Sequence, residues 1–462
     1  MVAEAEALAH IDLQKGWPTP RLLPSQPLLA AAEATLSDPK RATEAMLYGP
    51  NIGDPALRRE CAEWLSRLYR SRSPPAGSVD DKPVPISPER ICITAGASGN
   101  LACIMAAFSD PAYTRRVWMV EPTYFLACTV FDDAGFQGRL VGVPEDDGGL
   151  DVEHLRRMIE AVDLEEETTT GTPAIYKRPP QYPKLFRHVI YLVPTFSNPS
   201  SKTYPLERRE ALVRLAREKD ALLVTDDCYD FLSWSVETRG ETGRLSNGTS
   251  ETGLTPTPPP RLVDVDSSLP GGDLVWGNAV SNGSFSKVVG PGMRCGWAEA
   301  TPTFIWSYII GRRSGTVLFD SYRARSSDWS SRGTYSDVLV PLYQHRSTIL
   351  RQAVEEFLGP LGVKIDTGSS YKLVGNGKTG EVHGGFFLYI LFPVGIRSND
   401  VADVALKEYN LRFLSSGMMA VRGSKTTSDL LSRGARLCWA WQEEEQLVEG
   451  VQRIARVLKD RF

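Results

Sequence analysis

Short apolar blocks alternate with helical patterns through the first two thirds of the chain. Blocks of about six residues, bounded by polar or turn residues, are typical of buried strands; they lie at 90–95, 116–121, 138–143, 188–193, 221–226 and 278–283. Between them lie helical patterns such as 205–220, which starts at a proline and places Leu206, Leu212 and Leu215 on one face. This alternation predicts an α/β fold with a mostly parallel central sheet covered by helices.

Three segments interrupt the alternation. Residues 71–85, 164–185 and 235–273 are rich in Pro, Gly, Ser, Thr and charge, and we expect them to be exposed insertions. From about residue 330, long helical patterns and two apolar runs indicate a smaller α+β domain. We therefore expect an N-terminal arm over 1–45 that belongs to the small domain, a large domain over 46–325 and a small C-terminal domain over 326–462.

Composition narrows the class of protein. The 462 residues are 42% hydrophobic and 23% charged, which is ordinary for a globular protein, and the formal net charge of -4 provides no basic excess for binding nucleic acid. The seven cysteines have no CxxC spacing, which favours a reduced compartment. No signal pattern and no apolar run of about 18 residues is present, so we expect a cytoplasmic protein that does not bind membranes.

Polar residues follow four of the predicted strands. A glycine turn, Gly96-Ala97-Ser98, follows the first and opens a helix whose free N–H groups suit an anion. Tyr124, Asn198 and Asp226 stand at or just past the ends of three others, and an acid at the end of an apolar strand must find a partner. Because sites in such sheets form at the carboxyl ends of strands, we expect these residues to share one crevice.

The stretch "SFSKVVGPGMR" places one lysine in unusual company. Lys287 stands beside the hydroxyls of Ser284 and Ser286, and glycines and Arg294 follow. Hydroxyls, glycine backbone and an arginine suit an anion, and a lysine beside that anion can act as a nucleophile that forms imines. A surface lysine, the alternative, needs none of these neighbours.

Taken in order, these motifs resemble the class I/II aminotransferases, fold-type I enzymes that use pyridoxal 5'-phosphate. Within them the chain is most similar to the kynurenine and 2-aminoadipate aminotransferase group, through "SFSK", "DDCYDFL" and "KGWPTPRLLP". The resemblance runs from about residue 11 to the end. It rests on seven motifs: "YGPNIG" at Tyr48, "GAS" at Gly96, "EPTY" ending at Tyr124, "NP" at Asn198, "DDCY" from Asp226 to Tyr229, the lysine motif with Arg294, and "ARL" around Arg436.

The resemblance assigns a role to each of these residues. Lys287 forms a Schiff base with the cofactor and transfers the substrate proton. Asp226 pairs with the pyridine nitrogen, since in the family's pattern the acid stands three residues before the tyrosine, and Asp227 is left as a turn cap. The phosphate is held by Ser284, Ser286, Arg294 and the backbone at Gly96, Ala97 and Ser98, the ring oxygen by Asn198 and Tyr229, and the ring face by Tyr124.

Substrate contacts and assembly follow from the same resemblance. Arg436 takes the α-carboxylate beside Asn198, and Trp17 belongs to an arm that covers the substrate, which favours aromatic or medium-length side chains. Tyr48 reaches the phosphate of a neighbouring subunit, which implies a homodimer. No metal is expected. A substrate with a distal carboxylate would need another arginine, for which Arg21, Arg312 and Arg313 are candidates.

Three functions remain open at this point. The leading hypothesis is an aminotransferase that moves an amino group from an L-amino acid to a 2-oxo acid. The second is a lyase or synthase of the same fold and cofactor that eliminates, substitutes or forms a C–C bond in a specialised biosynthetic pathway. The third is a binding protein without turnover. One departure from the family pattern, Ser200-Ser201 where Thr-Gly is common after Asn-Pro, weakens any transfer of substrate preference.

Overall fold

A computed structural model describes most of the chain. The described residues are 8–69, 85–167, 175–177, 180, 182–237, 258–310, 335–368, 371–375, 378–424 and 428–462. Most of the three expected insertions, together with Arg312 and Arg313, lies outside these ranges. No helix among the described residues has the length and apolar character needed to span a membrane. The cytoplasmic location stays a prediction.

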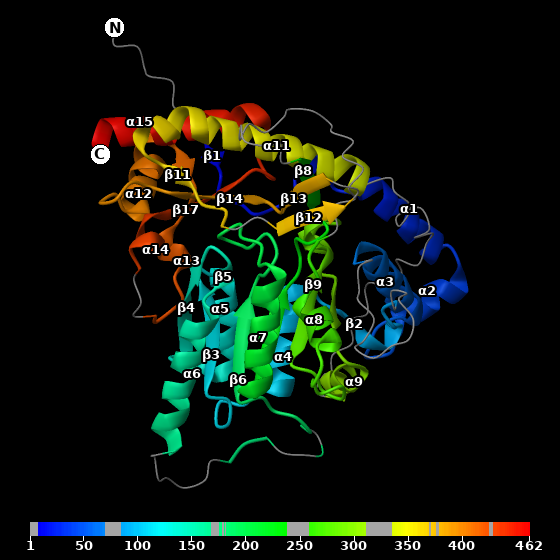
Figure 1. The fold of residues 1–462 in the computed structure, drawn as a ribbon. Helices are drawn as coiled ribbons and strands as arrows, with labels where there is room; N and C mark the ends of the chain where they lie inside the picture. Colours follow the sequence, from blue (N-terminus) through cyan, green and yellow to red (C-terminus); the bar gives the residue numbers. More distant parts are fainter. Residues whose placement is uncertain are drawn as a thin grey trace.

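An eight-stranded sheet forms the centre of the molecule (Figure 1). Its spatial order is β2 (Ile91–Thr94), β10 (Gly296–Glu299), β9 (Ala279–Ser284), β7 (Ala221–Asp226), β6 (His188–Leu192), β3 (Arg116–Glu121), β4 (Leu140–Asp146) and β5 (Gly149–Leu150). Only β10 and β5 run antiparallel to their neighbours. All six predicted strands are present, and the mostly parallel sheet is confirmed.

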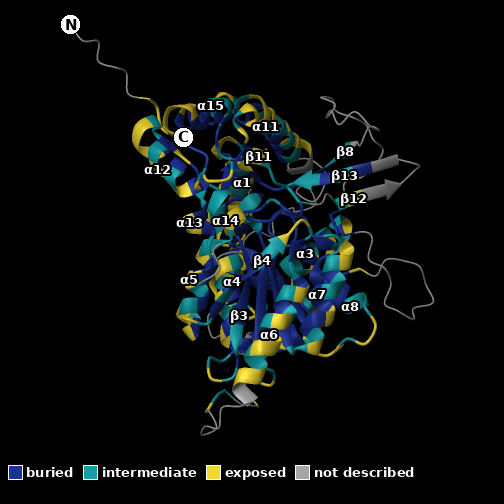
Figure 2. Ribbon diagram, turned by 60° about the vertical axis from the view of Figure 1, so that its left-hand side comes forward, coloured by how far each residue is buried: buried dark blue, intermediate teal, exposed yellow. Residues whose placement is uncertain are grey.

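Helices cover both faces of this sheet because both faces are apolar. Successive side chains of a strand point to opposite faces: Val117 and Met119 of β3 join one core cluster, and Trp118 and Val120 join the other. The first cluster includes side chains of α3 (Pro55–Leu68), α4 (Ala97–Phe108), α5 (Phe125–Phe131) and α9 (Pro302–Ile310); the second includes those of α6 (Val152–Glu167), α7 (Leu206–Glu218) and α8 (Leu262–Ser268). Figure 2 shows the buried strands between helices whose outer faces are exposed.

Local sequence signals set the helix ends. Asp54 caps α3 by accepting hydrogen bonds from the N–H groups of Ala56 and Leu57, and Pro55 occupies the first helical position, where its missing N–H costs nothing. Asp38 and a following proline start α2 (Pro39–Met46) in the same way, after α1 (Ser25–Leu36). The predicted helix at 205–220 forms as α7, directly after its proline.

The C-terminal third builds a second set of sheets above the first (Figure 1). Antiparallel pairing joins β11 (Lys364–Ile365), β14 (Phe387–Leu391), β17 (Gly434–Cys438) and β16 (Leu414–Ser415). Helices α11 (Val340–Ala353), α12 (Ser398–Tyr409), α13 (Ser416–Met419), α14 (Asp429–Arg433) and α15 (Glu444–Arg461) belong to this part. Strand β1 (Ile11–Asp12) pairs in parallel with β15 (Leu411–Arg412), so the N-terminal arm lies against the C-terminal part. The domain boundaries at 45/46 and 325/326 stay predictions.

One expected insertion is not wholly exposed. Within 235–273, α8 buries Leu262, Val263 and Val265 against α7, and the end of β8 (Ser233–Glu237) pairs with β13 (Lys378–Gly384), which also pairs with β12 (Tyr371–Gly375). The expectation was wrong for 258–268 because a short apolar block stands inside a segment whose average composition is polar. Similarly, α6 continues to Glu167, inside the expected insertion at 164–185.

Candidate active site

A cavity of about 400 Å³ lies where the carboxyl ends of the central strands meet the C-terminal sheet and the N-terminal arm. The structure brings most of the predicted residues to its walls: Trp17, Ala97, Ser98, Tyr124, Asn198, Asp226, Tyr229, Ser284, Ser286, Lys287, Arg294 and Arg436. They come from segments up to about 420 residues apart in sequence. The strand-end rule for parallel sheets thus holds for this chain.

One end of the cavity is built to hold an anion. Helix α4 starts at Gly96 without a side-chain cap, so its first N–H groups are available, and Ser284 and Ser286 share a hydroxyl contact of 2.9 Å. Arg294 donates to the carbonyl oxygens of Ala95 and Pro291, at 3.1 and 3.0 Å, and makes no ion pair with any described residue. A Cβ on Gly96 would lie 2.9 Å from the Arg294 guanidinium, and the positive φ of +84° also favours glycine there.

Lys287 follows β9 on a single 3-10 turn, Phe285–Lys287. Its Nζ donates to the carbonyl oxygen of Gly16 at 2.9 Å and lies 5.5 and 5.6 Å from the ring centres of Tyr229 and Phe386. Among the residues that the structure describes, no carboxylate lies within ion-pair distance of this amine. The amine is therefore held by neutral groups at the edge of the anion site.

Asp226 ends β7 with one oxygen lacking a partner. Its Oδ2 accepts a long hydrogen bond of 3.4 Å from the Tyr191 hydroxyl, and its buried Oδ1 has no hydrogen-bond partner in the described part of the chain. Burial raises the pKa of this carboxyl, and Cys228 and Lys287 act against that rise. Asp227 does not line the cavity; it accepts from the Thr225 hydroxyl at 2.9 Å instead.

Arg436 on β17 approaches the cavity from the C-terminal sheet. Its Nη1 donates to Asn198 Oδ1 at 2.6 Å, its Nη2 donates to the carbonyl oxygen of Gln14, and its guanidinium lies 4.0 Å from the ring centre of Phe387. It is only 4% exposed, its Nε has no partner among the described residues, and burial lowers its pKa. A buried cation that contacts only neutral groups suits an incoming carboxylate.

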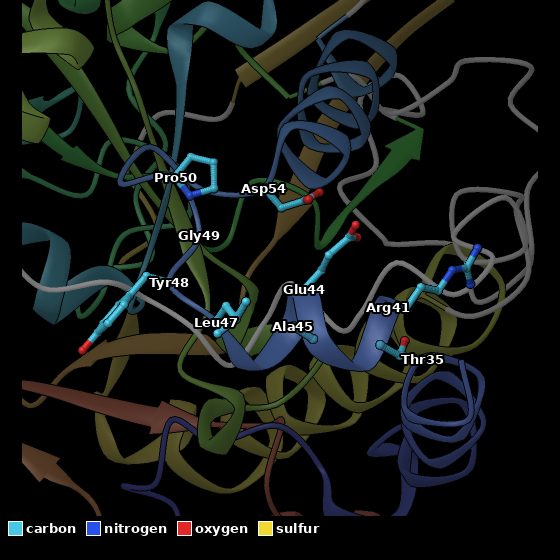
Figure 3. A pocket seen from close by; sticks show the side chains of 9 residues that line it. All are labelled: Thr35, Arg41, Glu44, Ala45, Leu47, Tyr48, Gly49, Pro50 and Asp54. Atoms are coloured by element: carbon cyan, nitrogen blue, oxygen red, sulfur yellow. The ribbon is translucent and has the colours of Figure 1, made fainter. Parts of the chain in front are cut away.

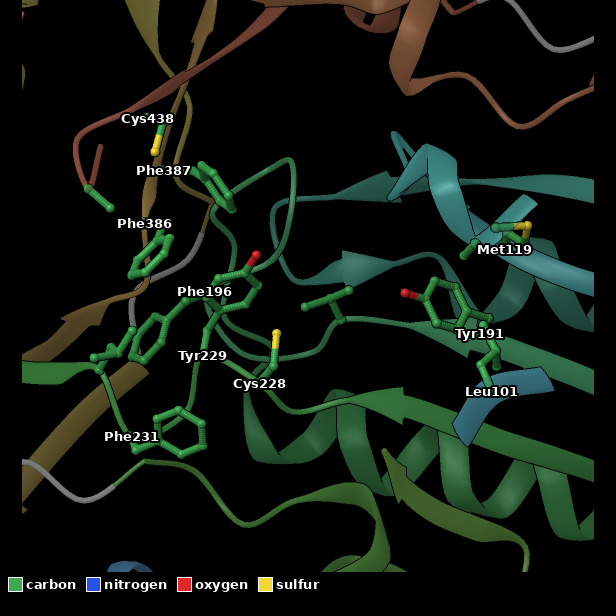
Figure 4. Packing of buried hydrophobic residues seen from close by; sticks show 14 of the residues in the cluster. Leu101, Met119, Tyr191, Phe196, Cys228, Tyr229, Phe231, Phe386, Phe387 and Cys438 are labelled. Carbon is green, nitrogen blue, oxygen red and sulfur yellow. The ribbon is translucent and has the colours of Figure 1, made fainter. Parts of the chain in front are cut away.

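Aromatic side chains close the space between these groups. Figure 4 shows Tyr229 packed among Phe196, Phe386 and Phe387, where the turn that follows β7 meets the start of β14. The rings of Phe386 and Phe387 stand edge-on to Tyr229, at 5.6 and 5.5 Å between centres. This packing fixes the ring of Tyr229 at the cavity wall.

Comparison with known proteins identifies the family. The family described as aminotransferase class I and II matches residues 20–331. The chain belongs to this family. As an aminotransferase it is an enzyme, and its family uses pyridoxal 5'-phosphate.

Individual relatives span nearly the whole chain. An uncharacterized protein of Saccharomyces cerevisiae is 27% identical over 449 residues, which cover 90% of each chain. Aromatic-amino-acid aminotransferase 1 of Thermococcus litoralis is 26% identical over 455 residues, covering 97% of this aminotransferase and 88% of that one. The crystal structure of Pyrococcus horikoshii kynurenine aminotransferase, in complex with PMP, has a TM-score of 0.68 at 23% identity and covers 98% of this chain and 91% of that chain. The last likeness shows the shared fold.

The cavity of this aminotransferase fits the cofactor. An anion cradle, a lysine amine and a buried carboxylate with an unpartnered oxygen match the phosphate, the aldehyde and the ring nitrogen of pyridoxal 5'-phosphate in chemical type. Tyr124, at the N-terminus of α5, also lines the cavity, as a residue that contacts the ring must. Burial raises the pKa of its phenol, so that the hydroxyl stays protonated.

Two predicted residues differ in where the structure places them. Trp17 lines the cavity but is 52% exposed, and its ring stands edge-on to Trp441 at 5.5 Å. Tyr48 does not line the cavity; it is 94% exposed and borders a separate hollow of about 310 Å³ between α2 and the start of α3 (Figure 3). Figure 3 shows the Tyr48 ring pointing away from Asp54. Within the described part of this one chain, Tyr48 contributes nothing to the cavity.

Several cavity residues escaped the sequence reasoning. They are Asp12, Gln14, Lys15, Gly16, Phe125, Leu126, Val193, Cys228, Pro291 and Arg412. Cys228 lies within the "DDCY" motif, in which site roles were assigned only to Asp226 and Tyr229. Lys15 and Gly16 stand in the "KGWPTPRLLP" motif, whereas Asp12, Gln14 and Arg412 carry no local signal and come together through the pairing of β1 with β15. Arg21, a candidate for a distal carboxylate, pairs instead with Glu443 at 3.1 Å and does not line the cavity.

Proposed function

We propose that this aminotransferase moves an amino group from an L-amino acid with an aromatic or medium-length side chain to a 2-oxo acid. Lys287 is its catalytic lysine and Arg436 its site for the α-carboxylate. The observation that carries the proposal is a pair of cations in one cavity, neither of which contacts a carboxylate among the described residues. A lysine without a counter-ion and an arginine without a counter-ion suit, respectively, a reactive amine and a carboxylate ligand.

The cofactor site is divided among several segments. When bound, pyridoxal 5'-phosphate supplies a conjugated electron sink for negative charge at the substrate Cα. Asp226 offers its unpartnered Oδ1 to a protonated ring nitrogen, and that pairing keeps the ring cationic. Asn198 and Tyr229 border the same cavity as the anion cradle of Ser284, Ser286 and Arg294. The phosphate would receive charge-assisted hydrogen bonds from Arg294.

Lys287 is the group that moves the proton. Once its amine is free and neutral, Nζ accepts the proton from Cα and holds it for return to the product side. The carbonyl oxygen of Gly16, 2.9 Å from Nζ, keeps the amine pointed into the cavity. Arg436 and Asn198 hold the α-carboxylate and so orient the Cα–H bond toward the lysine.

An apolar wall supports the preference for aromatic or medium-length side chains. Trp17, Phe125 and Leu126 line the same cavity as Arg436, where they would contact the substrate side chain. The Thermococcus litoralis relative is named for aromatic amino acids, and the Pyrococcus horikoshii structure for kynurenine. These names agree with the wall but describe other proteins.

We also propose a homodimer in which Tyr48 reaches the partner's phosphate site. Met46, Leu47 and Tyr48 are 69%, 60% and 94% exposed, a run of large apolar surface that a second subunit would cover. Tyr48→Phe should leave the dimer intact in sedimentation and weaken retention of the cofactor about ten-fold, through the loss of one hydrogen bond to a charged group. A monomeric protein that is fully active would overturn this part of the proposal.

A single-turnover experiment tests the function. The cofactor-loaded protein is mixed with a panel of L-amino acids and no acceptor. For at least one amino acid, the visible cofactor absorbance should fall while one equivalent of 2-oxo acid appears per site, and adding a 2-oxo acid should restore the absorbance. If the absorbance persists with every donor while another product accumulates, the lyase or synthase hypothesis replaces this one.

A further inference from the structure

A third cation lines the cavity without a counter-ion. Arg412 ends β15, its side chain is exposed toward the cavity, and in the described part of the chain it makes no ion pair and no side-chain hydrogen bond. Its backbone is held: the Leu13 N–H donates to the Arg412 carbonyl at 2.8 Å, and the residue pairs with Asp12 in register. The guanidinium thus projects from a fixed strand.

A count of charges in the cavity sets Arg412 apart. The lining cations are Lys15, Lys287, Arg294, Arg412 and Arg436, and the lining anions are Asp12 and Asp226. The proposed function assigns a ligand or reaction to three cations: Lys287, Arg294 and Arg436. Lys15 lies 3.9 Å from Asp12 and stands over the Trp17 and Trp441 rings, at 5.3 and 4.9 Å. Among these lining cations, only Arg412 is left with neither a partner in the described part of the chain nor an assigned ligand.

Strand register places Arg412 near the carboxylate site. Leu414 pairs directly with Arg436, and Arg412 stands two residues before Leu414 on the same stretch of chain. Two residues of extended chain span about 7 Å. The two carboxyl carbons of an extended five-carbon diacid lie roughly 5 Å apart, given C–C bonds of about 1.5 Å. The side chains of Arg412 and Arg436 are flexible enough to adjust for the difference between these two lengths.

We propose that Arg412 binds the distal carboxylate of a five-carbon dicarboxylic substrate whose first carboxylate is bound by Arg436. This inference rests on the proposed function and names the class of one substrate, a dicarboxylic 2-oxo acid or its amino acid. Arg412 acts as a specificity-determining residue, because a monocarboxylic substrate of the same length leaves it without a ligand.

Matched oxo acids provide the first test. The aminated form of the protein reacts with 2-oxoglutarate or with 2-oxopentanoate, which has the same chain length and lacks the distal carboxylate. Arg412→Gln should lower kcat/KM for 2-oxoglutarate about ten-fold, the size expected for one partly exposed charge-assisted pair, and leave 2-oxopentanoate unchanged. Arg412→Lys should retain part of the preference. Arg21→Gln, which alters an arginine of the N-terminal arm outside the cavity, is the control and should change neither value.

Binding without turnover provides the second test. Calorimetric titration of the cofactor-loaded protein with glutarate and with pentanoate should show tighter binding of glutarate, and Arg412→Gln should remove that advantage. Equal losses for both oxo acids, or no loss for either, overturn the role of Arg412 and leave the proposed function standing. If the unaltered protein converts no oxo acid, the proposed function fails. The role of Arg412 is then judged by binding alone: equal affinity of the unaltered protein and Arg412→Gln for glutarate overturns it.

Discussion

Arg261 and Arg436 are both almost fully buried, yet their guanidinium groups contact different partners. Arg261 donates to Asp264 at 2.9 Å, forms an ion pair with Glu299 at 2.7 Å and stands over the Tyr69 ring. Burial acts to lower the pKa of Arg261, and the two carboxylates outweigh it and raise that pKa. Within the described residues, the Arg436 guanidinium contacts an amide oxygen, a carbonyl oxygen and a ring but no carboxylate, and burial lowers its pKa.

A third arginine shows that a missing carboxylate alone does not mark a binding site. Arg209 is fully buried without an ion pair in the described chain, but its guanidinium donates to the carbonyl oxygens of Tyr204, Pro194 and Pro260 and to the Thr195 hydroxyl. It lines no described cavity. Arg436 differs because its Nε lacks a partner and because it borders a cavity. A guanidinium nitrogen without a partner and a position at the cavity wall together distinguish a ligand-binding arginine from a structural one.

Two lysines repeat the contrast. Lys202 is buried and lies 3.2 Å from Glu145 and 3.5 Å from Asp366, whereas the Lys287 amine forms no ion pair with any residue that the structure describes. The largest expected effect follows from this difference. Lys287→Ala should lower kcat by about 10⁴-fold, as for the loss of a group that transfers a proton, and leave the free energy of unfolding nearly unchanged. Steady-state kinetics and denaturant unfolding measure the two quantities.

Borohydride reduction sharpens the same prediction. Reduction of the cofactor-loaded protein, followed by peptide mapping, should locate the modification on Lys287 and not on Lys202. Modification of any lysine other than Lys287 would remove the basis of the catalytic assignment.

Substitution of Arg261 should lower stability, whereas substitution of Arg436 should lower activity. Arg261→Gln leaves Asp264 and Glu299 without their buried counter-ion, so the free energy of unfolding should fall by about 3–5 kcal/mol. Arg436→Gln should change it by less than about 1 kcal/mol and should cost about 2–4 kcal/mol in kcat/KM for an amino acid. Urea unfolding and steady-state kinetics of both variants test this. Loss of stability in both, with no selective loss of amino-acid binding, would contradict the comparison.

Arg294 separates cofactor binding from substrate binding. Arg294→Gln removes the charge-assisted contact to the phosphate and should weaken the cofactor by about 1.5–3 kcal/mol, measured by equilibrium dialysis. Once the protein is saturated with cofactor, its KM for the amino acid should stay near that of the unaltered protein. An Arg436→Gln variant that loses cofactor as readily as Arg294→Gln would show that the two arginines share one role.

A last effect, on stability alone, concerns the ion cluster around Lys202. Burial raises the pKa of Glu145 to about 7, against the opposing influence of Lys202. Since the folded protein keeps a proton that the unfolded chain releases, the free energy of unfolding should fall as pH rises from about 4.5 to about 7, by up to about 3 kcal/mol. Glu145→Gln should flatten that part of the profile, because Lys202 still contacts Asp366. Parallel unfolding profiles for the two proteins would show that Glu145 does not titrate there.

Much of the fold was accessible from local sequence. Six apolar blocks became the six predicted strands, because a buried strand of a parallel sheet must be apolar on both faces and so needs no long-range information. The exception was 258–268, where Leu262, Val263 and Val265 form too short an apolar block to outweigh their polar surroundings in a composition argument.

Some cavity residues could likewise be predicted from the sequence, and others could not. Lys287, its hydroxyl neighbours and Arg294 could be predicted because their chemistry is contiguous in sequence, and Asp226 because a strand end limits its position. Tertiary structure alone decided which atoms have no partner among the described residues: the Asp226 oxygen, the Arg436 Nε and the Arg412 guanidinium. Arg412 reaches the cavity through the pairing of β1 with β15, residues 400 apart in sequence. The sequence shows which charged and hydrogen-bonding side chains the chain contains. Hydrogen-bond partners between distant segments exist only once the chain has folded.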